Sequence, residues 1–201
     1  MVEVEVRPIA QKEESFFLKP TGALILLNAI CYAIFAIAGG NFIEIDFSLL
    51  ASFGQVNVLV LEGEYWRLFT SLFVHANILH LLGNLFFLLI FGLRSEDLFN
   101  NKTYLMVYFS SGLVGNLLTL LGDPYLISVG ASGAIFGLFG ASVIYIRRNI
   151  GQSIVGALIY SFYMFIMNIG ANVNIWSHFG GLAAGLVIGY LLSRNVSAKV
   201  E

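Results

Sequence analysis

Apolar residues gather in long blocks along this chain, and short polar breaks separate one block from the next. A block of about 20 apolar residues is long enough for a helix to cross the hydrocarbon layer of a membrane. The pattern predicts six such spans, at 21–39, 72–93, 103–121, 127–146, 151–169 and 176–193. The expected fold class is therefore all-α, a polytopic membrane protein built as a bundle of six transmembrane helices.

Two tails and one long segment lie outside the membrane domain's spans. Residues 1–20 form an acidic, charged N-terminal tail without the features of a secretory signal, so the first span is expected to be retained. Residues 194–201 form a short C-terminal tail. The segment 40–66 is too polar to span and too apolar to float free, and it is predicted to be a loop partly sunk in the interface. The membrane domain itself covers residues 21–193.

Composition agrees with this picture. Apolar residues make up 58% of the 201 residues and charged residues 11%, against roughly 45–50% and about 25% in a soluble domain. The net charge is −2 and no basic stripe is present, so nucleic acid is not an expected partner.

Basic residues give the orientation. With six spans both termini lie on one side, and nine of the ten Lys and Arg residues fall there, whereas Arg67 alone falls on the other side. Basic residues favour the cytoplasmic side. Both termini are therefore predicted to be cytoplasmic in a multi-pass protein of the cell membrane, with the 40–66 loop outside.

Polar residues stand out inside the apolar blocks: the three histidines His75, His80 and His178, together with Ser132 and Asn84. They lie near the starts of the second, fourth and sixth spans, which all run from the outside inward. At 1.5 Å per helical residue, Ser132 would lie about 9 Å below the outer surface. Their shared depth favours a single site.

Ser132 admits two interpretations. Gly130, Gly133 and Gly137 surround it with small residues, and Gly133 and Gly137 form a GxxxG pair that lets helices touch. Alternatively, Ser132 is a nucleophile that glycines leave approachable, at a helix start whose free N–H groups could stabilise an oxyanion.

His178 is the candidate base for that serine. A lone histidine on an apolar helix is more often a packing residue, but His178 precedes Gly181, Gly185 and Gly189, a repeated GxxxG face. Close packing of this face on the fourth span would bring the imidazole to Ser132. Serine needs such a base to attack at neutral pH.

His80 and Asn84 are four residues apart and share a helix face. They are either a hydrogen-bonding pair between helices or two donors aimed at an oxyanion. His75 is expected to point elsewhere, nearer the mouth of the site. The histidine spacing does not fit a metal site and no carboxylate lies within a span, so no metal or other cofactor is expected and a Ser-His dyad is favoured over a triad.

Taken together, these residues resemble the rhomboid family of intramembrane serine proteases, in the minimal six-helix prokaryotic form, over residues 20–193. The resemblance is carried by Tyr65-Trp66-Arg67, His75-x4-His80-x3-Asn84, Gly92-x3-Glu96, Gly130-Ala131-Ser132-Gly133 and Ser177-His178-x2-Gly181-x3-Gly185.

The resemblance implies endopeptidase cleavage of transmembrane substrate proteins near the outer membrane face, through an acyl-enzyme, with membrane lipids as surroundings. It implies that Ser132 is the nucleophile and His178 the general base and acid. The oxyanion hole would be formed by His80, Asn84 and the Ser132 N–H.

The resemblance also implies supporting roles. Phe136 stands where relatives often have a tyrosine packed on the histidine. Trp66, Arg67 and Glu96 would hold the first loop and the cytoplasmic end, and the glycines Gly130, Gly133, Gly181 and Gly185 would allow close approach. The fifth span and the 168–175 connection would form a lateral gate and cap. Separately, the position of His75 and Ser71, four residues apart near the mouth, suggests that they hold the hydrolytic water.

Two other function classes compete with this interpretation. A catalytically inactive relative that binds membrane proteins would typically have lost the serine or the histidine, and both are present here. A transporter or channel needs polar residues along a through-path, whereas the inner halves of the spans are almost wholly apolar.

Overall fold

The computed structural model describes residues 15–149, 155–156 and 174–197. Eight α-helices lie in these ranges: α1 (Pro20–Gly39), α2 (Phe47–Phe53), α3 (Asn57–Leu61), α4 (Arg67–Thr70), α5 (Ile78–Leu98), α6 (Asn101–Thr119), α7 (Ser132–Asn149) and α9 (Ile175–Ser197). Two 3₁₀ turns are η1 (Phe16–Leu18) and η2 (Ser71–Phe73). Strand β1 (Gln55–Val56) pairs antiparallel with β2 (Ile127–Ser128).

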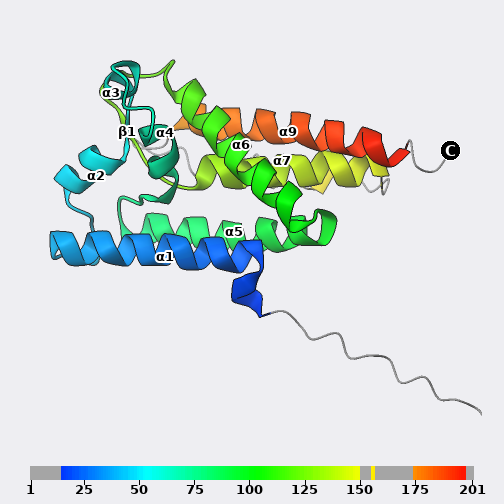
Figure 1. Ribbon diagram of the computed structural model, residues 1–201, viewed down its shortest axis with the longest axis horizontal. Helices are drawn as coiled ribbons and strands as arrows, with labels where there is room; N and C mark the ends of the chain where they lie inside the picture. Colours follow the sequence, from blue (N-terminus) through cyan, green and yellow to red (C-terminus); the bar gives the residue numbers. More distant parts are fainter. Residues whose placement is uncertain (1–14, 150–154, 157–173, 198–201) are drawn as a thin grey trace, which may run out of the picture.

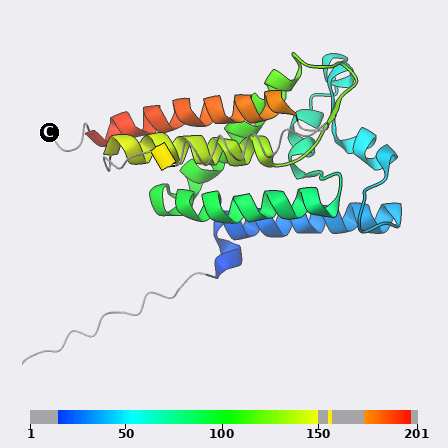
Figure 2. The same ribbon diagram turned by 180° about the vertical axis from the view of Figure 1, so that it is seen from behind.

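The long helices form a bundle with α2, α3 and α4 gathered at one end (Figure 1). Helix α1 packs along α5, and α7 packs along α9, while α6 crosses between the two pairs and contacts α9 and α7. The reverse view in Figure 2 shows the same pairs side by side. Helices α5, α7 and α9 run in the same direction, and all three start at the end where α2, α3 and α4 gather.

The expected count of six helices is not confirmed, because the described ranges alone contain eight. Within these ranges, three helices are long and apolar enough to cross a membrane: α1, α5 and α9 as far as Arg194. The expected fifth span at 151–169 lies outside the described residues, apart from 155–156. The extra helices arise because the 40–66 segment and the residues just after it fold into short helices.

Helices α6 and α7 are long, with 19 and 18 residues, but they are less apolar than the other three. Tyr104, Tyr108 and Asn116 of α6 are buried. A helix in the middle of the bundle contacts protein on most sides, so it can carry polar and small side chains that lipid would not accept.

Helices α7 and α9 approach to backbone contact. A Cβ atom added at Gly181 would overlap the carbonyl oxygen of Gly133, and one added at Gly185 would overlap that of Gly137. The predicted close packing of these two glycine faces is therefore confirmed.

The second apolar block becomes helical later than expected. The block was predicted to span 72–93, but α5 begins at Ile78, where the Asn77 side chain accepts a 2.8 Å hydrogen bond from the His80 N–H. Leu72, Phe73 and Val74 are buried in the protein core. They are apolar because they pack inside the protein, not because they continue a membrane helix.

The fourth apolar block differs in the same way. It was expected at 127–146, but its first two residues form β2, and α7 runs from Ser132 to Asn149. The pairing of β2 with β1 joins the chain just before Ser132 to the loop that follows α2.

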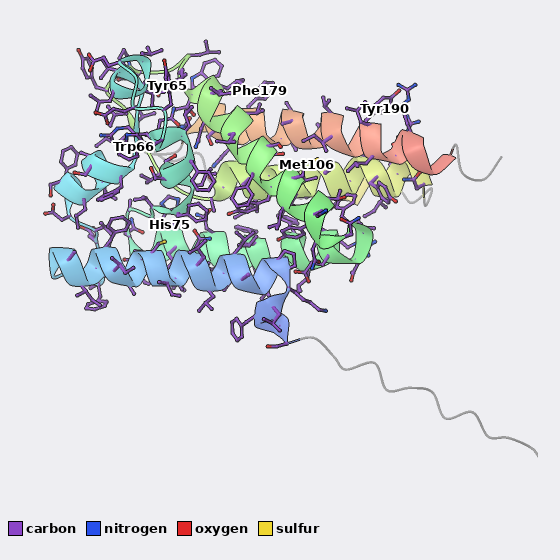
Figure 3. The ribbon with its side chains drawn as sticks, viewed as in Figure 1. Tyr65, Trp66, His75, Met106, Phe179 and Tyr190 are labelled. Atoms are coloured by element: carbon purple, nitrogen blue, oxygen red, sulfur yellow. The ribbon has the colours of Figure 1, made fainter. Side chains whose placement is uncertain are left out.

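Arg67 joins the short helices to one another. Its guanidinium donates hydrogen bonds of 2.7 and 2.8 Å to the carbonyl oxygens of Ala51 and Gly54, pairs with Glu64, and lies 4.6 Å from the centre of the Trp66 ring. Figure 3 shows Tyr65 and Trp66 at this end of the molecule, and both side chains are largely exposed. At the opposite end, Glu96 Oε1 accepts a 2.7 Å hydrogen bond from the Thr21 N–H and so ties the end of α5 to the start of α1.

Candidate active site

Ser132 and His178 form a direct hydrogen bond. Ser132 is the first residue of α7, and His178 lies in the first turn of α9. Because these helices run side by side in the same direction, their first turns meet. The distance from His178 Nε2 to Ser132 Oγ is 2.7 Å, and only 6% of the His178 surface is exposed. A serine in this contact can pass its proton directly to the imidazole as it attacks an electrophile.

The chain before Ser132 takes a sharp turn that requires glycine. Gly130 has a φ of +118°, and a Cβ atom there would lie 2.8 Å from His80 Nε2 and 3.9 Å from Asn84 Nδ2. The Gly130 N–H donates a 2.9 Å hydrogen bond to the Ser71 carbonyl. The backbone leading to the serine is thus fixed on one side and faces His80 and Asn84 on the other.

His80 and Asn84 present donors to this turn. His80 Nδ1 accepts a hydrogen bond from the Ala76 N–H at 3.5 Å, which leaves the hydrogen of a neutral ring on Nε2, the atom nearest Gly130. Asn84 Nδ2 gives one hydrogen to the His80 carbonyl at 2.9 Å. Its second hydrogen is available to a ligand, since an amide nitrogen carries two.

The far nitrogen of His178 has no hydrogen-bond partner among the described residues. In the same part of the chain, no group of three or more His, Cys, Asp or Glu side chains is placed to hold a metal ion. Among the described residues, the candidate site therefore pairs a serine with a histidine, and no carboxylate bonds to the far nitrogen of that histidine.

Phe136 covers the imidazole. It lies one helical turn after Ser132, and its ring centre is 4.8 Å from that of His178, with the ring planes tilted by 34°. This contact restricts the rotation of the histidine and leaves its Nε2 directed at the serine.

One cavity, of about 110 Å³, is lined by the expected catalytic and oxyanion side chains but not by His75. Its polar lining is Ser132, His178, His80 and Asn84. Its remaining lining is apolar: Leu79, Gly83, Phe87, Phe91, Ile135, Phe136 and Phe139. Residues from α5, α7 and α9 therefore meet at one site, as the shared depth in the sequence predicted.

His75 and Ser71 lie beside the site and do not line its cavity. His75 precedes α5, is fully buried, and packs its ring edge-on against His80, with 5.2 Å between ring centres. Residues 74–77 are not helical, and they place this ring outside the cavity lining but against His80. Ser71 accepts a 2.9 Å hydrogen bond from Asn116 Nδ2. That these two residues hold a water stays a prediction.

Sequence reasoning missed the role of Asn116 behind the dyad. From α6, its Nδ2 donates to the Leu68 carbonyl at 2.7 Å and to Ser71, and its Oδ1 accepts from Ser177 Oγ at 3.5 Å. Ser177 directly precedes His178, so α6 positions the start of α9.

The role of Asn174 was also missed by the sequence analysis. Its Nδ2 donates to Thr119 Oγ1 at 2.7 Å and to Ser128 Oγ at 2.6 Å, and its Oδ1 accepts from the Ser177 N–H. One signal in the sequence could have indicated these contacts. Asn116 and Thr119 are three residues apart, so they share one face of an otherwise apolar helix.

Comparisons with known proteins point to one family. The sequence model of one family, described as the rhomboid domain, matches residues 62–195. "Rhomboid-like protease 3" of Toxoplasma gondii is 37% identical over 62% of this chain and 51% of its own length. "Putative rhomboid protease YdcA" of Bacillus subtilis is 36% identical over 67% of this chain and 71% of its own. "Rhomboid protease GluP" of the same organism is 32% identical over 83% of this chain and 34% of its own.

Proposed function

The chain belongs to the rhomboid family, and on that basis we propose that it is an intramembrane serine endopeptidase that cleaves transmembrane proteins with a Ser132–His178 dyad. The observation that carries the proposal is the 2.7 Å hydrogen bond between His178 Nε2 and Ser132 Oγ inside a cavity. The chain is an integral membrane protein. It spans only part of the length of the relatives it matches, so their activity is carried to it as a proposal.

The first half of the reaction forms an acyl-enzyme. Ser132 Oγ attacks the substrate carbonyl carbon while His178 Nε2 takes the hydroxyl proton. The negative charge that develops on the carbonyl oxygen is stabilised by His80 Nε2–H, the free hydrogen of Asn84 and the Ser132 N–H. Donors of this kind each contribute roughly 10²–10³ in rate. His178 then protonates the departing amine, and the peptide bond breaks.

The second half releases the product. Water adds to the Ser132 ester, His178 accepts its proton, and the serine leaves with that proton restored. The hydrogen bond between the two residues supports this reaction over a binding-only role, which requires no such contact. The steps use no cofactor.

The proposed cleavage position is the outer half of the membrane. Ser132 and His178 lie at the end of the bundle where α2, α3 and α4 gather. Arg147, Arg148 and Arg194 lie in the last turns of α7 and α9, at the other end. Basic residues favour the cytoplasmic side, which supports an external site and cytoplasmic termini. The proposed lateral gate at 151–169 and 168–175 falls almost entirely outside the described residues and stays a prediction.

The test is cleavage of a fluorescent transmembrane substrate by the protein reconstituted in liposomes. We expect Ser132→Ala and His178→Ala to reduce cleavage to the uncatalysed background. Ser142→Ala is the matched control, because Ser142 is also buried on α7 but bonds to Ser95 instead of His178. Cleavage that survives Ser132→Ala in folded protein would overturn the proposal.

A further inference from the structure

The end of the bundle away from the candidate site carries two arginines next to one tyrosine ring. Arg148 lies in the last turn of α7, and its guanidinium carbon is 4.4 Å from the centre of the Tyr190 ring on α9. Arg194 follows Tyr190 by four residues and so lies on the same face of α9. Figure 3 shows Tyr190 towards the end of α9. Arginines of two helices therefore neighbour one ring, and none of the three residues lines the cavity at the dyad.

These two arginines have no acidic neighbour that balances their charge. The sequence contains no Asp or Glu between Asp123 and Glu201, so neither α7 nor α9 carries one. The ion pairs found among the described residues include neither Arg148 nor Arg194. Both side chains are exposed. Two neighbouring cations repel each other, and an anion bound between them would remove that repulsion.

The contact with Tyr190 leaves the hydrogen-bond donors of Arg148 available. A guanidinium over an aromatic ring uses its flat face, whereas its N–H groups point outward in the plane of the group. Two of these N–H groups can bind two oxygens of one phosphate in parallel. The ring also restricts the positions of the guanidinium, so less conformational entropy is lost when an anion binds. Tyr190 therefore prepares Arg148 to bind a phosphate.

An exposed apolar strip leads away from these arginines along α9. The exposed fractions of Val187 and Leu191 are 59% and 52%, and that of Tyr190 is 44%. Positions 187, 190, 191 and 194 are three and four residues apart, so they form one face of the helix. In a membrane the apolar part of this face contacts acyl chains, and the arginine at its end reaches the level of the lipid headgroups. The surface therefore matches a phospholipid, which has apolar chains below a phosphate.

We infer that Arg148, Tyr190 and Arg194 bind the phosphate of an anionic phospholipid, whose acyl chains lie along Val187 and Leu191. A headgroup with net negative charge, such as phosphatidylglycerol, is favoured, because the cation of a zwitterionic headgroup would be held near two arginines. Arginines at helix ends also offset the helix dipole, and basic residues favour the cytoplasmic side. Neither effect requires an aromatic ring under Arg148, so a change at the ring distinguishes a lipid site from both.

The test measures lipid binding to the purified full chain in a neutral detergent by native mass spectrometry. Dioleoylphosphatidylglycerol and dioleoylphosphatidylcholine are titrated separately. We expect the wild-type protein to bind phosphatidylglycerol at least about tenfold more tightly, since each basic residue near an anionic headgroup contributes about fivefold. Arg148→Gln and Arg194→Gln should each lower the affinity for phosphatidylglycerol about fivefold.

Two further variants separate a built site from attraction to net charge. Tyr190→Leu changes no charge but removes the ring under Arg148, and it should lower the affinity for phosphatidylglycerol about threefold. Arg94→Gln is the matched control, because it removes a charge from the same end of the bundle. Arg94 already pairs with Asp97 at 3.7 Å, so its loss should change the affinity by less than about twofold.

Equal affinity of the wild-type protein for the two lipids, or an unchanged affinity in both arginine variants, overturns the lipid site. An equal fall in Arg94→Gln, or no fall in Tyr190→Leu, indicates attraction to net charge alone and also overturns it. Displacement of phosphatidylglycerol by millimolar inorganic phosphate would assign the site to a free anion instead of a lipid. The unfolding midpoint in lipid-free detergent shows that each variant is folded. Arg148→Lys, which keeps the charge but loses the planar fork, replaces any variant that is not, and it should also lower the affinity.

Discussion

At the scale of single residues, the site depends on how the backbone approaches Ser132. The serine follows Gly130, whose φ of +118° suits glycine alone and whose missing side chain makes room for His80 Nε2. The Gly130 N–H is bonded to the Ser71 carbonyl. Any side chain at 130 therefore disturbs both the serine and a proposed oxyanion donor.

We predict that Gly130→Ala lowers kcat by at least about tenfold. Gly63→Ala is the matched control, because Gly63 has a similar φ of +114° but a Cβ atom there would have no neighbour within 4 Å among the described residues. Both changes introduce backbone strain of roughly 1–2 kcal/mol, but only Gly130→Ala displaces His80. Equal kcat values for the two variants, measured on folded protein in liposomes, would contradict this account.

Residue-level prediction from the sequence succeeded for side chains that lie on helices and failed for side chains in the non-helical segments. The approach of Ser132 to His178 followed from two glycine-bearing helices with the same direction. The contact of His75 with His80 did not follow, since helical periodicity says nothing about a side chain in the non-helical 74–77 segment.

At the scale of elements, the contact between α7 and α9 holds the two reactive residues together. Gly181, Gly185 and Gly189 of α9 face α7 without any side chain in between. This face is visible in the sequence as a four-residue repeat. Its partner on α7 was also predictable, because Gly133 and Gly137 have the same spacing.

We predict that Gly185→Ala destabilises the protein, since its Cβ would overlap the Gly137 carbonyl. Overpacking of this kind costs about 1–3 kcal/mol, which should lower the midpoint of thermal unfolding in detergent micelles. Gly83→Ala on α5, where a Cβ atom would meet no heavy atom of the described residues within 4 Å, should leave the midpoint unchanged or raise it. A midpoint for Gly185→Ala equal to that of the wild type would show that the helices separate without cost.

Helix α6 positions the dyad from behind. Asn116 bonds to Leu68, Ser71 and Ser177, and so links the chain before α5 to the residue before His178. We predict that Asn116→Ala lowers kcat by a larger factor than it changes KM, because His178 is no longer held in place beside Ser132. Each buried group left unpaired should also reduce stability by about 1–3 kcal/mol.

The control for this variant is Asn101→Ala, an exposed asparagine at the start of the same helix. It should retain wild-type kcat and unfolding midpoint. An Asn116→Ala protein that unfolds earlier but turns over at the wild-type rate below its midpoint would reduce Asn116 to a structural residue.

The ends of the elements were the least predictable feature. An apolar run has the same composition whether it faces lipid or the protein core, so Leu72, Phe73 and Val74 extended the expected second span although they are buried beside it. The second span was expected to end at residue 93, but α5 continues through Arg94 and Glu96 to Leu98. These charged residues are accommodated because they lie at the end of the bundle.

At the scale of the whole molecule, the two ends of the bundle differ. The short helices, the exposed Tyr65 and Trp66 and the candidate site gather at one end, whereas Tyr190 and the ends of α7 and α9 lie at the other (Figure 3). This asymmetry agrees with the distribution of basic residues in the sequence.

We predict that the site end faces outward. In a Cys31→Ser background, a single cysteine at the exposed Glu62 position should react with a membrane-impermeant maleimide in intact cells, since basic residues keep the opposite end inside. A reporter fused after residue 201 should read cytoplasmic. Labelling of the residue-62 cysteine only after cell lysis would reverse the topology.

The central claim is that Ser132 is a nucleophile activated by His178, and covalent labelling tests it most directly. The reconstituted protein is treated with a fluorophosphonate, and the modified peptide is identified by mass spectrometry. The account predicts one adduct, on Ser132, whose formation is lost in His178→Ala and retained in Ser142→Ala. An adduct on another residue, no adduct on active protein, or labelling of Ser132 at the wild-type rate in His178→Ala would contradict it.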